Sequence, residues 1–352
     1  MTEFFPSFLN DLLFDPELSH LVGTDADCAA MLKFEMALAE AEAANGLISE
    51  DAALTIVEMG ATFAPGIVTL QHATLKDGVV VPEFVRELRD YVGGDASQYL
   101  HFGATSQDVI DTVLALKLKR VFILFESRLQ VLLETLDGLV NVHGQNQLMG
   151  RTRMQAAIPI TVADRLDVWR GLVSRAGDDL ASVREKNLIL SLAGPAGTSE
   201  KFGNKIDAVR NSLAGLLGLS VPDYVPHAAR DRIATLGNWL SLVTGALGKI
   251  GQDIALMAQN EIAEIALEGG GGSSAMAHKQ NPVRAEVLVS LARFNAVQVS
   301  GLHQALVHEQ ERSGAAWTLE WLILPQMLNA TGTALTHAQA LLDQVRRIGS
   351  AA

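Results

Sequence analysis

A glycine- and serine-rich stretch at residues 268–282 has the residue types that a catalytic loop needs. It reads Glu-Gly-Gly-Gly-Gly-Ser-Ser-Ala-Met-Ala-His-Lys-Gln-Asn-Pro. Glycine loses much backbone entropy when it is ordered, so four in a row predict a loop that moves or whose amides approach a ligand. Ser273 or Ser274 could act as a nucleophile or base, Lys279 could supply a positive charge, and Asn281 could supply an amide group. Composition alone favours the other interpretation, a flexible linker.

The end of this stretch has the residue types that open a helix. Asn281 is a favoured N-cap residue and Pro282 a favoured first helical residue. A helix N-terminus binds anions through its free backbone N–H groups. We therefore expect an anionic ligand at this loop.

A second segment with polar side chains lies at residues 101–108 and reads His-Phe-Gly-Ala-Thr-Ser-Gln-Asp. It comes directly before a predicted long helix. Thr105 and Asp108 have the spacing of a capping box, in which side chains satisfy the first backbone N–H groups of a helix. Taken by itself, this segment is typical of a helix start, although helix capping and anion binding can coexist at one place.

Three further segments carry arginines. Residues 150–161 read Gly-Arg-Thr-Arg-Met-Gln-Ala-Ala-Ile-Pro-Ile-Thr, and residues 226–233 read Pro-His-Ala-Ala-Arg-Asp-Arg-Ile. Residues 308–321 read His-Glu-Gln-Glu-Arg-Ser-Gly-Ala-Ala-Trp-Thr-Leu-Glu-Trp. A basic pair before a helix is usually a solvated surface feature, and two tryptophans four residues apart usually pack in a core.

These segments together resemble the signatures of the fumarase/aspartase superfamily, which includes argininosuccinate lyases, adenylosuccinate lyases and carboxymuconate cycloisomerases. Residues 272–282 are similar to Gly-Ser-Ser-x-Met-Pro-x-Lys-x-Asn-Pro, with Ala277 in place of the first proline. Residues 101–112 resemble His-x-Gly-x-Thr-Ser-x-Asp-x-x-Asp-Thr. Residues 150–161 resemble Gly-Arg-Thr-His-x-Gln-x-Ala-x-Pro-x-Thr, with Arg153 at the histidine position. Cycloisomerases share that departure, and residues 226–233 and 308–321 look more like cycloisomerases than lyases.

The resemblance implies a role for each matching residue. It makes Ser273 the residue that transfers a proton, with Lys279 and Asn281 beside it in the catalytic set. It also implies a set of substrate-binding residues: His101, Thr105, Ser106, Arg151, Thr152, Arg153, Gln155, Arg230 and Arg312. The implied activity is a cofactor-independent and metal-independent conversion of the small tricarboxylate 3-carboxy-cis,cis-muconate to 4-carboxymuconolactone in protocatechuate catabolism.

The resemblance also implies an architecture. It predicts an all-α fold with a smaller N-terminal helical domain at residues 1–95 and a long-helix bundle at residues 96–352. It predicts a homotetramer in which each active site takes residues from three subunits. Many members continue into a small C-terminal helical domain, which we expect to be absent here because the chain ends soon after the last predicted bundle helix.

Two other functions stay open. A lyase acting on adenylosuccinate or argininosuccinate shares most of the signature residues, although Arg153 argues against lyase chemistry. The second is a helical oligomer that has the same fold and no catalytic activity. It would have no need of Ser273, Lys279 and Asn281 together, so their presence argues against it.

The spacing of apolar residues predicts the elements that must position these segments. Long helices are indicated at about 108–143, 161–187, 229–267, 282–311 and 317–347, and shorter ones at 26–45, 51–59 and 82–91. Strand signals are few. Long helices with wide apolar faces must be buried against other helices, so a bundle that associates with further copies is expected.

Composition limits the classes of partner. The 352 residues carry a formal charge of −13, which disfavours nucleic acid as a partner because phosphate binding needs a basic face. The longest apolar span, residues 233–248, is too short for a membrane helix. The one cysteine, Cys28, cannot form an internal disulfide. Because no signal peptide is recognisable, we expect a cytoplasmic protein that binds no membrane.

Overall fold

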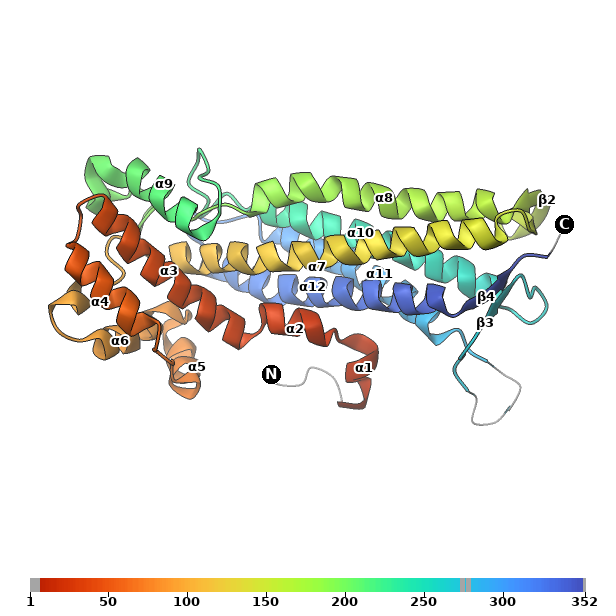
Figure 1. Cartoon of the computed structure of the whole chain (residues 1–352), viewed down its shortest axis with the longest axis horizontal. Coiled ribbons are helices and arrows are strands. Elements are labelled where there is room, and N and C mark those ends of the chain that lie inside the picture. Colours follow the sequence, from red (N-terminus) through yellow and green to blue (C-terminus); the bar gives the residue numbers. More distant parts are fainter. Residues whose placement is uncertain (1–6, 273–275, 277–279, 351–352) are drawn as a thin grey trace.

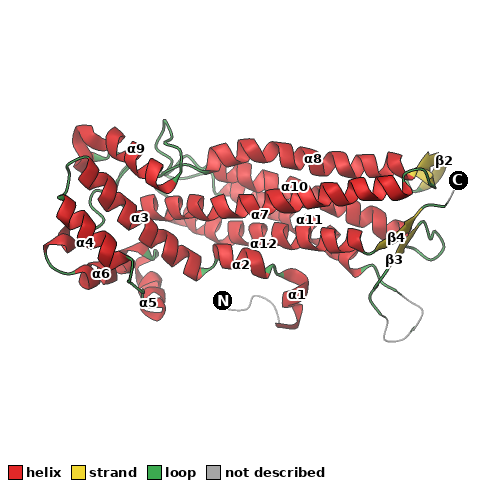
Figure 2. Ribbon diagram, viewed as in Figure 1, coloured by secondary structure: helices red, strands yellow, loops and turns green. Residues whose placement is uncertain are grey.

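The computed structural model describes residues 7–272, 276 and 280–350, and within these ranges nearly all elements are helices (Figure 1, Figure 2). The predicted all-α class is confirmed. The helices are α1 (Asn10–Leu13), α2 (Pro16–Val22), α3 (Thr24–Ala44), α4 (Glu50–Gly60), α5 (Ile67–Asp77), α6 (Val81–Val92), α7 (Ser106–His143), α8 (Val162–Asn187), α9 (Ile206–Leu217), α10 (Asp231–Met257), α11 (Val283–Gln304) and α12 (Gly314–Asp343). The strands are β1 (Gln147–Thr152), β2 (Gln155–Thr161), β3 (Ile265–Leu267) and β4 (Val345–Ile348).

The long helices α7, α8, α10, α11 and α12 lie side by side and form an elongated bundle (Figure 1). Successive members run in opposite directions along most of the bundle. The longest, α7, has 38 residues, which at 1.5 Å per residue makes it about 57 Å long. Long helices lie in all five stretches predicted from apolar spacing, but three of them end earlier than predicted. α10 ends at Met257 and its predicted continuation contains a turn and β3, α11 ends at Gln304, and α12 ends at Asp343 before β4.

Aliphatic and aromatic side chains fill the bundle core. Trp169 of α8 and Trp239 of α10 are buried, and each indole N–H has an acceptor, the Asp253 carboxylate at 2.8 Å and the Ala176 carbonyl at 2.9 Å respectively. Phe125 of α7 packs against Trp239 with 6.2 Å between ring centroids. Across the described residues, no helix combines the length and apolar character required to cross a bilayer.

A second core lies at the end of the bundle where α7 begins. It gathers α3, α4, α6 and α9 around Phe34, Phe84 and Phe202, which are buried. The first turns of α7 contribute Val109 to this core and α9 contributes Leu213. The domain boundary at residue 95 stays a prediction, because this core takes residues from both sides of it.

Two small antiparallel sheets lie at the opposite end of the bundle (Figure 1). The hairpin β1–β2 joins α7 to α8, and the pair β3–β4 joins segments that follow α10 and α12. Gln147 and Ser350 exchange backbone hydrogen bonds of 2.9 and 3.1 Å, which tie the C-terminal segment to the hairpin. Neither strand pair is predicted from sequence, because β3–β4 joins segments far apart in the chain and β1–β2 contains Gly150 and Pro159, which are disfavoured in strands.

Large apolar side chains also lie on the outer faces of the bundle. Ile123 and Val142 of α7, Leu242 of α10, Val297 of α11 and Leu322 of α12 are each more than half exposed. Exposed apolar side chains distributed over several long helices are expected where further helices pack in an assembly.

Candidate active site

The predicted site segment at residues 101–108 contains the turn that opens α7. Thr105 is the N-cap residue, and its backbone N–H donates to Oδ2 of Asp108 at 3.0 Å, as the capping pattern predicts. Gly103 has a φ of +70°, and a Cβ there would lie 2.5 Å from the Phe202 ring. Only glycine fits this turn without strain. The turn places Ser106 in the first helical position, where a helix N-terminus can bind an anion.

Asp108 fixes this turn to two other parts of the chain. Its buried carboxylate accepts hydrogen bonds from the backbone N–H groups of Ala193 at 2.8 Å and Gly194 at 3.0 Å. It also lies 2.8 Å from Nε2 of His227, which is buried as well. Several donors converging on one buried carboxylate give a rigid arrangement, so the start of α7 is held in place from three sides.

Arg230 lies beneath the same region at the start of α10 and is 2% exposed. Its guanidinium donates to Asp111 at 2.6 and 3.1 Å, to Glu320 at 2.8 and 2.6 Å, and to the Pro226 carbonyl at 3.4 Å. Burial alone would raise the pKa of the Asp111 carboxyl, but the charges of Arg230 and Arg232 lower it. Every N–H group of Arg230 thus has an acceptor within the chain, and its contact with substrate stays a prediction.

Arg312 differs from Arg230 in its partners. Its Nε donates to the amide oxygen of Gln107 at 2.7 Å, and one Nη donates to the Pro195 carbonyl at 3.2 Å. Within the described ranges it forms no ion pair with a carboxylate. Its charge is therefore available to an anion beside the start of α7.

His101 has a buried partner that sequence analysis missed. Its Nδ1 lies 2.7 Å from Oε1 of Glu35, a residue of α3 whose side chain is fully buried. Burial would lower the pKa of the imidazole, but the Glu35 carboxylate raises it above its usual range. With Nδ1 bound to Glu35, Nε2 is the ring atom left for a ligand. The two residues are 66 positions apart, and no local pattern links them.

The predicted site segment at residues 150–161 lies in the hairpin β1–β2 at the other end of the bundle. Thr152 ends β1 and pairs with Gln155 at the start of β2, while Arg153 lies in the turn between them with a φ of 49°. These side chains are exposed. Arg151 forms an ion pair with Glu264 at 2.7 Å. The hairpin therefore exposes hydroxyl, amide and guanidinium groups on the surface at this end of the bundle.

The glycine-rich segment is closed at its base. Gly271 and Asn281 exchange backbone hydrogen bonds of 2.9 and 2.8 Å. α11 begins at Val283 with Pro282 as N-cap, one residue later than predicted, because the backbone of Asn281 is held in this pair. Ser273 and Lys279 lie outside the described residues, so their roles stay predictions.

The predicted site residues fall into two groups at opposite ends of one chain. His101, Ser106, Arg230 and Arg312 lie where α7 begins, whereas the hairpin lies beyond the end of α7 (Figure 1). Asn281 precedes α11, whose first turn lies at the hairpin end. Among the described residues, no group of three or more His, Cys, Asp or Glu is arranged to hold a metal ion.

Comparison with known proteins identifies the family. The family model described as lyase matches residues 17–301. A 3-carboxy-cis,cis-muconate cycloisomerase from Pseudomonas aeruginosa is 37% identical over 319 residues, which are 89% of this chain and 70% of that protein. The crystal structure of 3-carboxy-cis,cis-muconate lactonizing enzyme from Pseudomonas putida is 33% identical with a TM-score of 0.89, and the match covers 96% of this chain and 77% of that one. The β-carboxy-cis,cis-muconate cycloisomerase structure from Acinetobacter calcoaceticus is 30% identical with a TM-score of 0.90, covering 96% and 78%. This chain therefore belongs to the lyase family.

Proposed function

We propose that the protein is a cofactor-independent cycloisomerase that converts 3-carboxy-cis,cis-muconate to 4-carboxymuconolactone. The observation that carries the proposal is the similarity, over most of the chain, to proteins of that name. The donor and cationic groups at the start of α7 suit a small substrate with several carboxylates. We place the activity in the cytoplasm, in the catabolism of protocatechuate by the β-ketoadipate pathway.

In the proposed reaction, a carboxylate oxygen of the substrate bonds to one carbon of a conjugated double bond. The electron pair of that bond moves to the neighbouring carbon and into its carboxylate, which becomes doubly charged. Protonation of that carbon completes the addition. One proton is consumed for each lactone formed, and two of the three carboxylates remain.

Stabilising the doubly charged carboxylate is the main demand on the enzyme. In many enzymes, preorganised donors aimed at a developing charge contribute more to the rate enhancement than any other effect. We assign this role to Ser106 and Arg312 at the start of α7, together with Lys279 and Asn281. Ser273 delivers the proton. Thr152 and Gln155 of the hairpin bind the substrate. Arg230 holds together the helices that lie beneath the start of α7.

The proposed enzyme is a homotetramer in which three subunits complete each active site. The separation of the two groups by the length of α7 supports sharing, because one copy cannot bring them to one substrate. The exposed apolar side chains on α7, α10, α11 and α12 support association. The start of α7 from one subunit would meet the hairpin and the glycine-rich segment of two others.

The test is an ultraviolet assay with 3-carboxy-cis,cis-muconate, because lactonisation removes the conjugated diene and its absorbance. The proposal expects catalytic loss of absorbance that needs no added ion or nucleotide. Adenylosuccinate and argininosuccinate serve as comparison substrates. Turnover of either without turnover of the muconate would indicate a lyase, and binding of all three without turnover would indicate a non-catalytic protein.

A further inference from the structure

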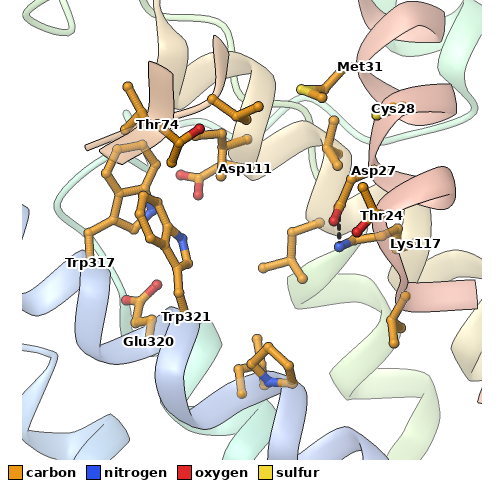
Figure 3. Close-up of a pocket in the computed structure, with 18 of the residues that line it drawn as sticks. Thr24, Asp27, Cys28, Met31, Thr74, Asp111, Lys117, Trp317, Glu320 and Trp321 are labelled. Carbon is orange, nitrogen blue, oxygen red and sulfur yellow. Dashed lines mark hydrogen bonds and ion pairs between the residues drawn. The ribbon is translucent and has the colours of Figure 1, made fainter. Parts of the chain in front are cut away.

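A cavity of about 530 Å³ lies between the N-terminal helices and the bundle (Figure 3). Its walls come from α3 and α5 on one side and from α7 and α12 on the other. Its volume falls within the range of small-molecule pockets, roughly 300–1,000 Å³. The described hairpin residues Thr152 and Gln155 and the first residue of α7, Ser106, do not line it, whereas the ion-pair cluster of Asp111, Arg230 and Glu320 beneath the start of α7 does.

Most of the lining is apolar. Aliphatic side chains come from all four helices, and the α12 side contributes two tryptophans. The apolar lining includes Met31, Ile67, Leu70, Ile110, Leu114 and Leu328. Burial of apolar ligand surface against such walls supplies roughly 25 cal/mol for each Å² removed from water. The cavity thus favours a ligand that is largely hydrocarbon.

The charged groups in the lining are already paired. Lys117 forms an ion pair with Asp27 across the α7–α3 side, drawn as a dashed line in Figure 3. Arg230 forms ion pairs with both Asp111 of α7 and Glu320 of α12. A charged ligand would lose its hydration without gaining an unpaired opposite charge, which is strongly unfavourable. These pairs select a neutral ligand.

Two indole rings give the cavity an aromatic wall. The centroids of Trp317 and Trp321 are 4.7 Å apart and the ring planes are tilted by 52°, and both side chains lie at one edge of the cavity (Figure 3). The next turn of α12 holds Pro325, which lacks the N–H that would normally bond to the Trp321 carbonyl. Offset or edge contacts with a further ring are favourable on such a surface.

We propose that this cavity is a binding site for a neutral small molecule that carries an aromatic ring. The cavity lies beside the proposed active site and borders the same ion-pair cluster, but its occupation does not depend on the proposed cycloisomerase activity. Binding there would be read directly by Trp317 and Trp321, whose fluorescence responds to a ligand against the indoles. It would also cover Cys28, which lines the α3 wall and is the one cysteine of the chain.

The test uses the intact protein and the neutral dye N-phenyl-1-naphthylamine, which fluoresces in apolar surroundings. We expect saturable binding with one dye for each chain. Cys28→Trp fills the cavity from the α3 wall and should weaken the dye Kd by at least about tenfold. Ala29→Trp is the matched control, because Ala29 is the next residue of α3 and is exposed. It should bind the dye as the unmodified protein does.

A second measurement keeps the test valid if Cys28→Trp fails to fold. In the unmodified protein, bound dye should slow the alkylation of Cys28 by N-ethylmaleimide in proportion to occupancy. The proposal would be overturned if the dye did not bind, or if Cys28→Trp and Ala29→Trp bound it equally. It would also be overturned if bound dye did not change the rate of Cys28 alkylation. Displacement of the dye by 3-carboxymuconate would also overturn it, since the cavity would then belong to the active site. These outcomes are read without turnover, so they do not depend on the ultraviolet assay.

Discussion

The partners of individual side chains at the start of α7 separate those that hold the site from those that can meet a substrate. Every N–H group of Arg230 donates to an acceptor within the chain, whereas Arg312 forms no ion pair among the described residues. His101 is bound at Nδ1 by Glu35. Its other ring nitrogen, Nε2, can therefore face a substrate carboxylate. The Glu35 carboxylate stabilises the positive charge of the His101 imidazolium in that arrangement.

We expect Glu35→Gln to change the pH dependence of substrate binding. Glu35 raises the pKa of His101, so imidazolium persists to higher pH in the wild type, and removing the carboxylate makes it deprotonate at lower pH. Asp108 also raises this pKa and Arg89 lowers it, but both stay unchanged in the variant. The alkaline limb of kcat/KM should move to lower pH, mainly through KM.

Glu40→Gln is the matched control for this experiment, since Glu40 is an exposed residue of the same helix. Its pH profile should match that of the wild type. An unchanged profile in Glu35→Gln would show that the Glu35 charge does not act through His101.

Ser273→Ala should nearly abolish turnover and leave folding and substrate affinity close to wild type. The reason is the predicted proton delivery by its hydroxyl, which the resemblance assigns to this position. Turnover above about a tenth of wild type would correspond to less than about 1.4 kcal/mol of transition-state stabilisation and would contradict the assignment. Ser274→Ala, measured in parallel, shows whether the neighbouring hydroxyl is the one required.

The residue types at the site could be predicted from sequence, but their partners could not. The motif segments indicated Thr105, Asp108 and Arg312 directly. The contacts of Asp108 with His227 and of Arg230 with Glu320 join residues 119 and 90 positions apart. Such contacts depend on how helices pack, and one sequence carries no local signal for that.

At the scale of elements, ion pairs fix the helices that meet below the site. Arg230 at the start of α10 joins Asp111 of α7 to Glu320 of α12. Some of the other helices, such as α2, α4 and α8, are fixed at their starts by a side-chain cap. At the start of α8, for example, the backbone N–H of Asp164 donates to the Thr161 hydroxyl at 3.1 Å. The backbone N–H of Thr161 donates to the Asp164 carboxylate at 2.8 Å. The register of three long helices at this end therefore depends on one guanidinium.

We expect Arg230→Met to reduce the free energy of unfolding by about 3–5 kcal/mol, because two buried carboxylates would lose the guanidinium that donates to both. Urea unfolding followed by circular dichroism measures this change. Arg86→Met removes an arginine from an exposed pair with Glu83 and Asp90 and should have little effect. Equal, small effects of the two substitutions would mean that the buried network does not hold the helices together.

Most helices with a continuous apolar stripe could be predicted, although α9, which buries Val209, Leu213 and Leu217, was not. α3, α4 and α6 begin and end within two residues of their predicted bounds. α5 went unpredicted because it buries only Leu70 and so shows little periodicity. The strand pair β3–β4 brings Ile265 opposite Ile348, a pairing set by the return of α12 to the end of α10.

At the scale of the whole molecule, the bundle holds the two halves of the proposed site far apart. The half around Ser106 and the half around Thr152 lie at opposite ends of α7 (Figure 1). A substrate a few ångströms across cannot touch both in one chain. The proposed site is therefore completed only when the ends of the molecule lie against other copies.

Mixing two inactive variants tests this arrangement. Ser106→Ala and Thr152→Ala should each be inactive alone. After they are unfolded together and refolded as a mixture, sites with an intact Ser106 from one chain and an intact Thr152 from another should appear. Random assortment makes roughly a quarter of the sites free of both lesions. Mixed tetramers without recovered turnover would show that each site lies within one chain.

The length of α7 also restricts how the chain can vary. An insertion of seven residues would nearly restore the facing of the helix while adding about 10.5 Å to its length. That addition would move the hairpin away from the position that the proposed shared site requires, unless α8, α10, α11 and α12 lengthened by the same amount. The bundle therefore acts as a ruler, and length differences between related chains should fall in the connections between the long helices.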